Sequence, residues 1–200
     1  MTEINPQFSQ YTELRQSIRE LCGQFKSEYW QKVEENSAYP EQFVKELTAA
    51  GWLSALIPEE FGGAGLGVTE ASVILEEINR SGANSGACHA QMYIMGTLLR
   101  HGSPQQKKNY LPKIASGDLR LQSFAVTEPT TGTDTTSTKT FATRKGDRYV
   151  VDGQKVWISR MQHSDLMLLL AQLRLSPKLK RKPRDCRCSS WICAQEHRRA

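Results

Sequence analysis

The chain has 200 residues, which suits one large domain or two small ones, and its composition is ordinary for a protein that buries a core. It has no apolar run of the roughly 20 residues that a membrane span needs. Its first residues resemble neither a secretory signal nor an Arg-rich, acid-poor transit peptide. We therefore expect a cytoplasmic protein without membrane association.

The net charge of +5 comes from one end of the chain. Residues 172–200 carry nine Lys or Arg and two acidic residues, whereas residues 1–171 carry 17 Lys or Arg and 19 acidic residues. The cysteines divide similarly, and Cys22 and Cys88 are too far apart in sequence to suggest a disulfide framework. The body is thus near-neutral, and the basic tail differs from it.

Helical periodicity of apolar residues fills the first half of the chain and predicts five helices. The first follows an apolar stripe from Leu14 to Phe25. The others are expected from Pro40 to Gly51, from about Thr69 to Arg80, from about Asn84 to Arg100, and from Ser103 to about Ile114. In the last of these, Ser103 and Gln106 have the spacing of a capping box.

Strand patterns replace the helical ones after Leu119. Strands are expected at Leu121–Thr127, within Thr135–Thr143 and at Leu166–Ala171, and a hairpin is expected from Arg148–Val151 to Lys155–Ile158 around Asp152-Gly153. This order predicts an α+β protein. Its helical domain would span residues 1–118, a partial β domain residues 119–171, and a tail residues 172–200.

Two features of the helical half could suggest ligand sites. Phe61–Gly67 is rich in glycine, but it lacks the G-x-G-x-x-G spacing and a strand-to-helix context, so a plain loop is the favoured interpretation. His89 and His101 flank a predicted helix without acids or cysteines at metal-ligand spacing. We expect structural roles for both histidines, and no metal.

The segment Phe124–Asp134 contains Thr127-Glu128-Pro129, where a strand ends and the chain turns. Its amides and threonine hydroxyls suit the polar edge of a heterocycle or a pyrophosphate, but a Thr-rich turn would look the same. In Gly153–Ser159, Trp157 and Ser159 would share one face of a strand, where an indole can cover a flat ring. A core Trp explains this second segment equally simply.

Together these motifs resemble the acyl-CoA dehydrogenase family. Order and spacing match over about Tyr11–Ala171, through Pro58–Gly63, His101–Ser103, Lys113–Gly117, Val126–Asp134 and Gly153–Ser159. The resemblance implies a helical domain, a middle β domain and a C-terminal four-helix domain, with FAD between the last two. It assigns flavin and pyrophosphate contacts to Phe124, Val126, Thr127, Gly132 and Thr133, and the other flavin edge to Trp157, Ile158 and Ser159. It also assigns Thr133 to the substrate's CoA side. The β-branched Thr131, where the family often has a small residue, is expected to crowd the turn.

The resemblance also implies the reaction, which is α,β-dehydrogenation of an acyl-CoA thioester to the trans-2-enoyl-CoA in fatty-acid or amino-acid catabolism. A Glu takes the α proton, FAD takes the hydride, and an electron-transfer flavoprotein takes the electrons from a homo-oligomeric enzyme. In the family that Glu belongs to the C-terminal domain, and no position of this chain corresponds to it. We therefore expect a truncated chain that is inactive alone.

The tail fits a shifted reading frame. Codons made from the last base of one residue and the first two of the next can encode only Leu at Asp185–Cys186 and only Asp at Trp191–Ile192. The other junctions permit Gly-Leu-Ser-Val-Phe-Leu-Val-Asp, which resembles the family's continuation. We infer a one-base frameshift near Gln172 and expect a disordered tail.

Two other functions stay open. The chain could be a non-catalytic interaction fragment whose basic tail binds acidic partners, or its fold could use FAD for monooxygenation or another oxidation. The frameshift explains the basic run Lys178–Arg187 without nucleic-acid binding. It also explains the residues Cys186, Cys188, Cys193 and His197, whose spacing fits no common zinc site.

Overall fold

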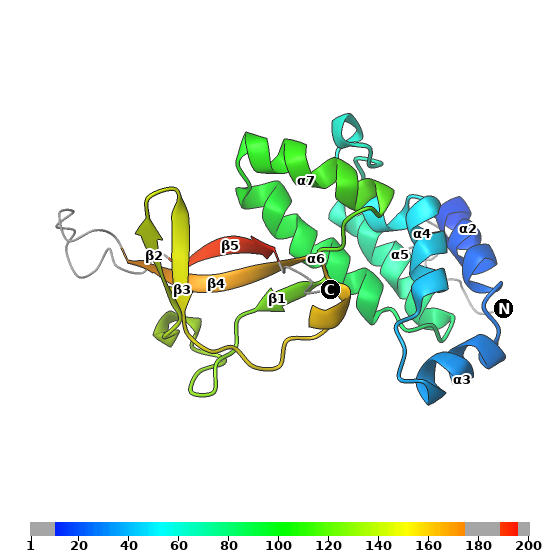
Figure 1. Cartoon of the computed structure of the whole chain (residues 1–200). Helices are drawn as coiled ribbons and strands as arrows, with labels where there is room; N and C mark the ends of the chain where they lie inside the picture. The colour runs from blue at the N-terminus through cyan, green and yellow to red at the C-terminus, as the bar shows by residue number, and fades with distance from the viewer. Residues whose placement is uncertain (1–10, 175–188, 196–200) are drawn as a thin grey trace. The chain divides into compact units, whose positions relative to one another are not determined.

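The computed structural model describes residues 11–174 and 189–195. Two compact units make up the chain, a helical unit that ends at Arg120 and a β unit that begins at Leu121 (Figure 1). The predicted fold class, an all-α domain followed by a partial β domain, is confirmed. Among the described residues, no helix has the length and apolar character needed to cross a membrane.

The described part of the helical unit contains six α-helices. They are α2 (Thr12–Cys22), α3 (Ser27–Glu35), α4 (Glu41–Ala49), α5 (Val68–Arg80), α6 (Gly86–His101) and α7 (Pro104–Ser116), with 3₁₀ turns η1 (Trp52–Ser54) and η2 (Glu59–Phe61) between α4 and α5. All five predicted helices are present. The capping box of α7 is confirmed, because Ser103 Oγ accepts from the Gln106 amide at 3.2 Å and Gln106 Oε1 accepts from the Ser103 amide at 2.8 Å.

Helix α3 is the one helix of this unit that the sequence did not predict. It has no fully buried residue, and only Tyr29, Trp30 and Val33 are half-buried. A helix with so little apolar surface produces no stripe at helical spacing, so periodicity could not reveal it. Its aromatic rings nevertheless pack edge-on against Phe25 and Phe43, with Trp30 and Phe43 centroids 4.9 Å apart.

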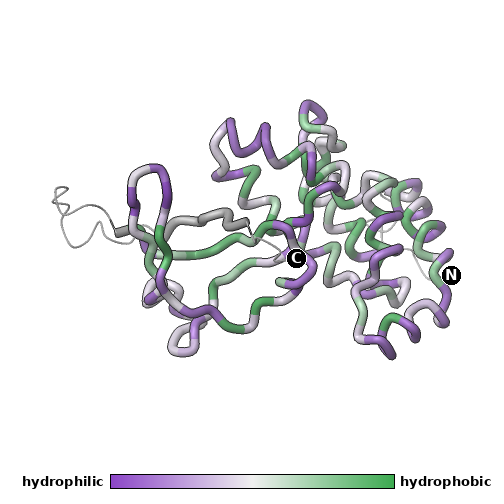
Figure 2. The backbone as a smooth tube through the Cα atoms, viewed as in Figure 1, coloured by the Kyte–Doolittle hydropathy of each residue, from purple (hydrophilic) through white to green (hydrophobic). Residues whose placement is uncertain are grey.

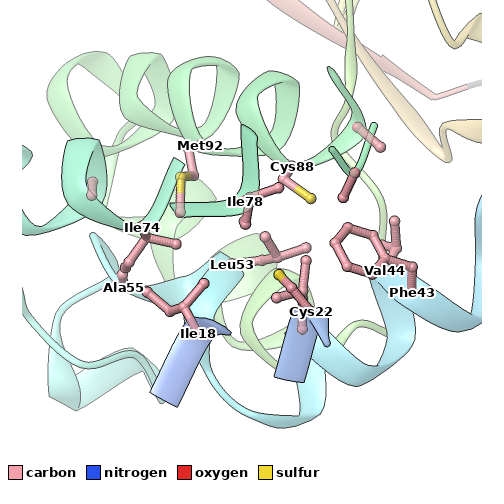
Figure 3. Packing of buried hydrophobic residues seen from close by; sticks show 14 residues of the cluster. Ile18, Cys22, Phe43, Val44, Leu53, Ala55, Ile74, Ile78, Cys88 and Met92 are labelled. Atoms are coloured by element: carbon pink, nitrogen blue, oxygen red, sulfur yellow. The ribbon is translucent and has the colours of Figure 1, made fainter. Parts of the chain in front are cut away.

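The core of the helical unit lies between α2, α4, α5 and α6 (Figure 3). Side chains from each of these helices and from η1 meet there, among them Ile18, Phe43, Leu53, Ile78 and Met92. A buried ion network joins α2 to α5 beside this core. The Glu77 carboxylate accepts from Arg15 Nη1 and from Arg19 Nε, both at 2.6 Å. Hydrogen bonds from Arg19 hold the pKa of Glu77 below its usual value, although burial alone would raise it.

The β unit is one five-stranded sheet built around β4. Its strands are β1 (Ser123–Ala125), β2 (Phe141–Lys145), β3 (Arg148–Asp152), β4 (Leu166–Arg174) and β5 (Ser189–Gln195). Strand β4 pairs in parallel with β1 near Met167 and with β2 near Gln172, and antiparallel with β5. Leu166–Ala171 is apolar throughout (Figure 2), as expected for a strand buried within a sheet.

The predicted hairpin around Asp152-Gly153 is wrong. The hairpin of the β unit joins β2 to β3, and its turn is Gly146-Asp147, where Gly146 has a φ of 65°. Residues 153–158 form no strand, and the first part of the expected Thr135–Thr143 strand is the 3₁₀ turn η3 (Thr135–Ser137). The chain has two dipeptides of Gly and Asp six residues apart, Gly146-Asp147 and Asp152-Gly153, and the first of them makes the hairpin turn.

The end of the sheet differs from the expected boundary. Strand β4 extends past Ala171 to Arg174, and the backbone of residues 189–195 forms β5, which the sequence did not predict. The free edge of β4 offers unpaired backbone groups, and the segment around Trp191-Ile192 has enough β-propensity to use them. The disordered tail expected for the rest of residues 172–200 lies outside the described residues.

Candidate functional site

The Thr127-Glu128-Pro129 segment forms a tight turn directly after β1. Glu128 and Thr131 exchange both backbone hydrogen bonds, at 2.8 and 3.2 Å, so that Pro129 and Thr130 form the tip. Thr131 Oγ1 then donates to the Asp134 carbonyl at 2.6 Å. The Asp134 carboxylate caps η3, and hydrogen bonds from the Ser137 and Thr136 hydroxyls lower its pKa. The Thr-rich turn is therefore internally fixed.

The Gly153–Ser159 segment lies against this turn. The Val156 amide donates to the Thr127 carbonyl at 2.9 Å, so the two segments lie side by side. Gly153 makes the close approach possible, because a Cβ at this position would lie 2.4 Å from Thr140 Oγ1. This is why a glycine is required there although it makes no hairpin turn.

Trp157 has an unusual environment for a tryptophan. It is 88% exposed, and its φ of 60° is in the left-handed region that a bulky residue rarely adopts. Both interpretations that the sequence allowed are wrong in detail, because Trp157 is neither a core residue nor in a strand face shared with Ser159. Backbone strain of this kind clusters at ligand-binding positions.

The other predicted site residues are in the same unit. Phe124, which is in β1, is 38% exposed. Outside that strand, Thr127 and Ile158 are half-buried, whereas Thr133 and Ser159 are exposed. Gly132 has an ordinary φ, and a Cβ there would lie 3.7 Å from Thr127 Cγ2. Direct contacts thus join Thr127 to Val156 and place Gly132 beside Thr127.

A buried ion pair beneath the turn has the strongest electrostatic effect at the site. The Glu128 and Lys155 side chains are 3% and 6% exposed, and Lys155 Nζ lies 3.0 Å from Glu128 Oε1. Burial raises the pKa of Glu128, but hydrogen bonds from the Thr140 hydroxyl, the Lys139 and Thr140 amides and Lys155 outweigh it and lower the pKa to about 2. Neither residue has a role that the sequence could predict, because a pairing across 27 residues leaves no local pattern.

The glycine-rich loop of the helical unit is a plain loop, as the sequence favoured. Every backbone N–H from Phe61 to Gly67 donates within the chain, to carbonyls of residues 54–59 or to the Glu70 carboxylate. No amide of this loop is therefore left to bind phosphate. His89 has a structural contact, since its ring lies 4.6 Å from the Tyr93 ring, and the described residues contain no cluster that could hold a metal ion.

Comparison with known proteins matches both units. The model of the acyl-CoA dehydrogenase N-terminal domain matches residues 9–118, and that of the middle domain matches residues 123–191. This chain belongs to the acyl-CoA dehydrogenase family. The mitochondrial isovaleryl-CoA dehydrogenase of Pongo abelii is 30% identical to it over 178 residues, which are 86% of this chain and 42% of that protein. The chain thus spans about two fifths of the length of such curated relatives.

Solved structures show the same acyl-CoA dehydrogenase fold. The crystal structure of an acyl-CoA dehydrogenase from Geobacillus kaustophilus matches 97% of this chain and 49% of its own, with a TM-score of 0.78 and 23% identity. An acyl-CoA dehydrogenase from Bacillus anthracis, complexed with FAD, matches 96% of this chain and 32% of its own, with a TM-score of 0.75 and 24% identity.

The residues around Trp157 fit a flavin. An exposed indole can cover a flat apolar ring, and the nearby hydroxyls of Thr127, Thr133 and Ser159 can meet the ring's polar edge or a phosphate. The absence of a Cβ at Gly132 leaves room for a close approach beside Thr127. The Glu128–Lys155 pair is internally balanced, so these two residues add no net charge to the site.

Proposed function

We propose that this chain is the helical and middle part of an enzyme that uses FAD to convert an acyl-CoA thioester to its trans-2-enoyl-CoA. One observation carries the proposal. The Val156–Thr127 hydrogen bond joins the two motifs of the family's flavin site, and directly beside it Trp157 is held exposed in a left-handed conformation. Family membership supports this reaction over the interaction-fragment alternative.

In this proposal the chain's residues bind and orient the cofactor. Thr127 donates its hydroxyl to the polar edge of the ring system, and Trp157 and Ile158 cover the ring and exclude water. Gly132 and Thr133 approach the pyrophosphate, with Thr133 also toward the CoA side, while Phe124, Val126 and Ser159 complete the surroundings. Bound FAD supplies a two-electron acceptor for the substrate's β hydride.

The remaining chemistry requires groups that we place outside residues 11–174. The α proton of a thioester is a weak acid, so its removal needs a positioned carboxylate base and hydrogen-bond donors for the developing enolate. We propose that a Glu in the part of the protein beyond this chain's span is that base. We also propose that the whole enzyme is a homo-oligomer that passes its electrons to an electron-transfer flavoprotein.

The proposal is tested by restoring one base near codon 172, reading through, and purifying the product beside the 200-residue chain. The restored protein should be yellow and should lose its flavin colour when an acyl-CoA is added without oxygen. The 200-residue chain should be colourless or weakly yellow and inactive, because an open site stays wet and weakens electrostatic stabilisation. A yellow restored protein that no acyl-CoA bleaches would contradict the reaction, and turnover by the 200-residue chain would contradict the assignment of the base.

A further inference from the structure

Three segments of the β unit converge on one buried pair of charges. Glu128 Oε1 accepts from the Thr140 hydroxyl at 2.5 Å, the Thr140 amide at 2.8 Å and Lys155 Nζ at 3.0 Å, while Oε2 accepts from the Lys139 amide at 2.7 Å. The carboxylate therefore ties the signature turn both to the entry of β2 and to the Gly153–Ser159 segment. Both side chains that donate to Glu128 are buried, since Thr140 is 2% exposed and the Lys155 side chain is 6% exposed. The geometry of this group is therefore closely constrained.

Lys155 donates hydrogen bonds to the residues on both sides of Thr127. Its Nζ donates to the Val126 carbonyl at 2.8 Å and to Glu128 at 3.0 Å, and the next residue, Val156, donates its amide to the Thr127 carbonyl at 2.9 Å. Three consecutive residues of the turn are thus held by two consecutive residues of the other segment. Trp157 follows immediately, at the point where the backbone enters the left-handed region.

This arrangement is better explained by positioning than by stability. A buried ion pair contributes little net stability compared with an apolar pair of the same volume, because both ions lose their hydration. It does impose one geometry, since both charges must find their partners at the same time. Here the geometry that it imposes is the spacing between Thr127 and Trp157.

We propose that Glu128 and Lys155 form a latch that positions Thr127 and Trp157 for the flavin. The inference rests on the proposed function for the identity of the ligand, and on the contacts of the apo chain for the latch itself. Neither latch residue touches the flavin in this scheme, so both are positioning residues. Loss of the latch frees the Val156 amide and leaves Trp157 without a fixed place, while the rest of the sheet stays paired through β4.

The test uses the 200-residue chain and three variants. Lys155→Met keeps the length of the side chain and removes its charge. The double variant Glu128→Gln with Lys155→Met leaves no unpaired buried charge, and serves if the single variant does not fold. Arg19→Met is the matched control, because it removes two hydrogen bonds to a different buried carboxylate, Glu77, in the helical unit.

The first measurement is hydrogen exchange of the Val156 amide relative to the amides of β4. We expect this ratio to rise at least about tenfold in both Lys155 variants, because local opening no longer requires sheet unfolding. The ratio should stay at its wild-type value in Arg19→Met. A wild-type ratio in both Lys155 variants would overturn the latch.

The second measurement is titration of the same four proteins with FAD, followed by quenching of tryptophan fluorescence. Weak saturable binding is expected for wild type and Arg19→Met, with affinity lower by about tenfold or more in the Lys155 variants. Equal affinity in all four would overturn the positioning role. If wild type binds no FAD, the proposed cofactor site of this chain fails, and the exchange ratio still decides whether the latch exists.

Discussion

Protonation of Glu128 should destabilise the β unit in acid. The pKa of this carboxyl is about 2 in the folded chain, against a usual value of 4.5. A group whose folded pKa is depressed stabilises the fold above its unfolded pKa, and this contribution is lost as the pH falls through the folded pKa. The window is therefore from about pH 4.5 down to about pH 2. At about 1.4 kcal/mol per pKa unit, the full loss is about 3 kcal/mol, of which about 2 kcal/mol is gone by about pH 3.

The assay compares wild type with Glu128→Gln, whose amide is similar in size but does not titrate. Hydrogen exchange of the β4 amides reports the unfolding free energy of the β unit separately from that of the helical unit. The variant should be less stable near neutral pH, because Lys155 loses its charged partner. The difference in unfolding free energy between wild type and Glu128→Gln should then narrow by about 2 kcal/mol between about pH 7 and about pH 3. A gap that stays constant over this range would refute the reasoning.

Four further substitutions test other parts of the structure. Gly63→Ala should destabilise the helical unit by about 1–3 kcal/mol in urea unfolding, because the new Cβ would lie 2.1 Å from a backbone oxygen. Gly96→Ala in α6 meets nothing within 4 Å and should stabilise the unit by up to about 1 kcal/mol. Equal effects of the two substitutions would contradict this difference in packing. Glu77→Gln should cost about 1–3 kcal/mol by urea unfolding, because Arg15 and Arg19 lose a buried charged acceptor while Arg15 keeps its ion pair with Glu76, and a loss under about 1 kcal/mol would show that the network relaxes. Trp157→Gly should raise the melting temperature, because glycine removes a left-handed cost of about 1 kcal/mol at an exposed position, and should weaken FAD binding in the titration; a lower melting temperature would show that the indole packs in the apo chain.

Helices were predictable from the sequence where burial follows a periodic stripe, as for Ile18 in α2 and Ile74 and Ile78 in α5. The capping box at Ser103 marked a helix start by local chemistry alone. Apart from α3, which buries too little apolar surface to produce a stripe, the failures arose where the deciding contact was not local. Gly153 resembles a turn residue in sequence, but glycine is required there by a positive φ of 156° and by the close approach of Thr140, which lies in another segment.

The candidate site was likewise predictable only in part from the sequence. The motif residues around Thr127 and Trp157 could be chosen from residue type and from family resemblance. The ion pair that holds these residues in place could not be predicted, because Glu128 pairs with Lys155 across a stretch that includes β2, β3 and the turn between them. The left-handed backbone at Trp157 also leaves no trace in the sequence, since nothing in an indole favours that conformation.

The central position of β4 has a consequence for synthesis of the chain on the ribosome. The helical unit is a compact unit within the first 120 residues, so it can fold while the rest is still being translated. Strand β1 cannot, because its partner near Met167 emerges much later, and β2 must also wait for β4. During that interval β1 and the β2–β3 hairpin have no sheet to join. Nascent chains should therefore depend on chaperones most between the emergence of Ser123 and that of Arg174.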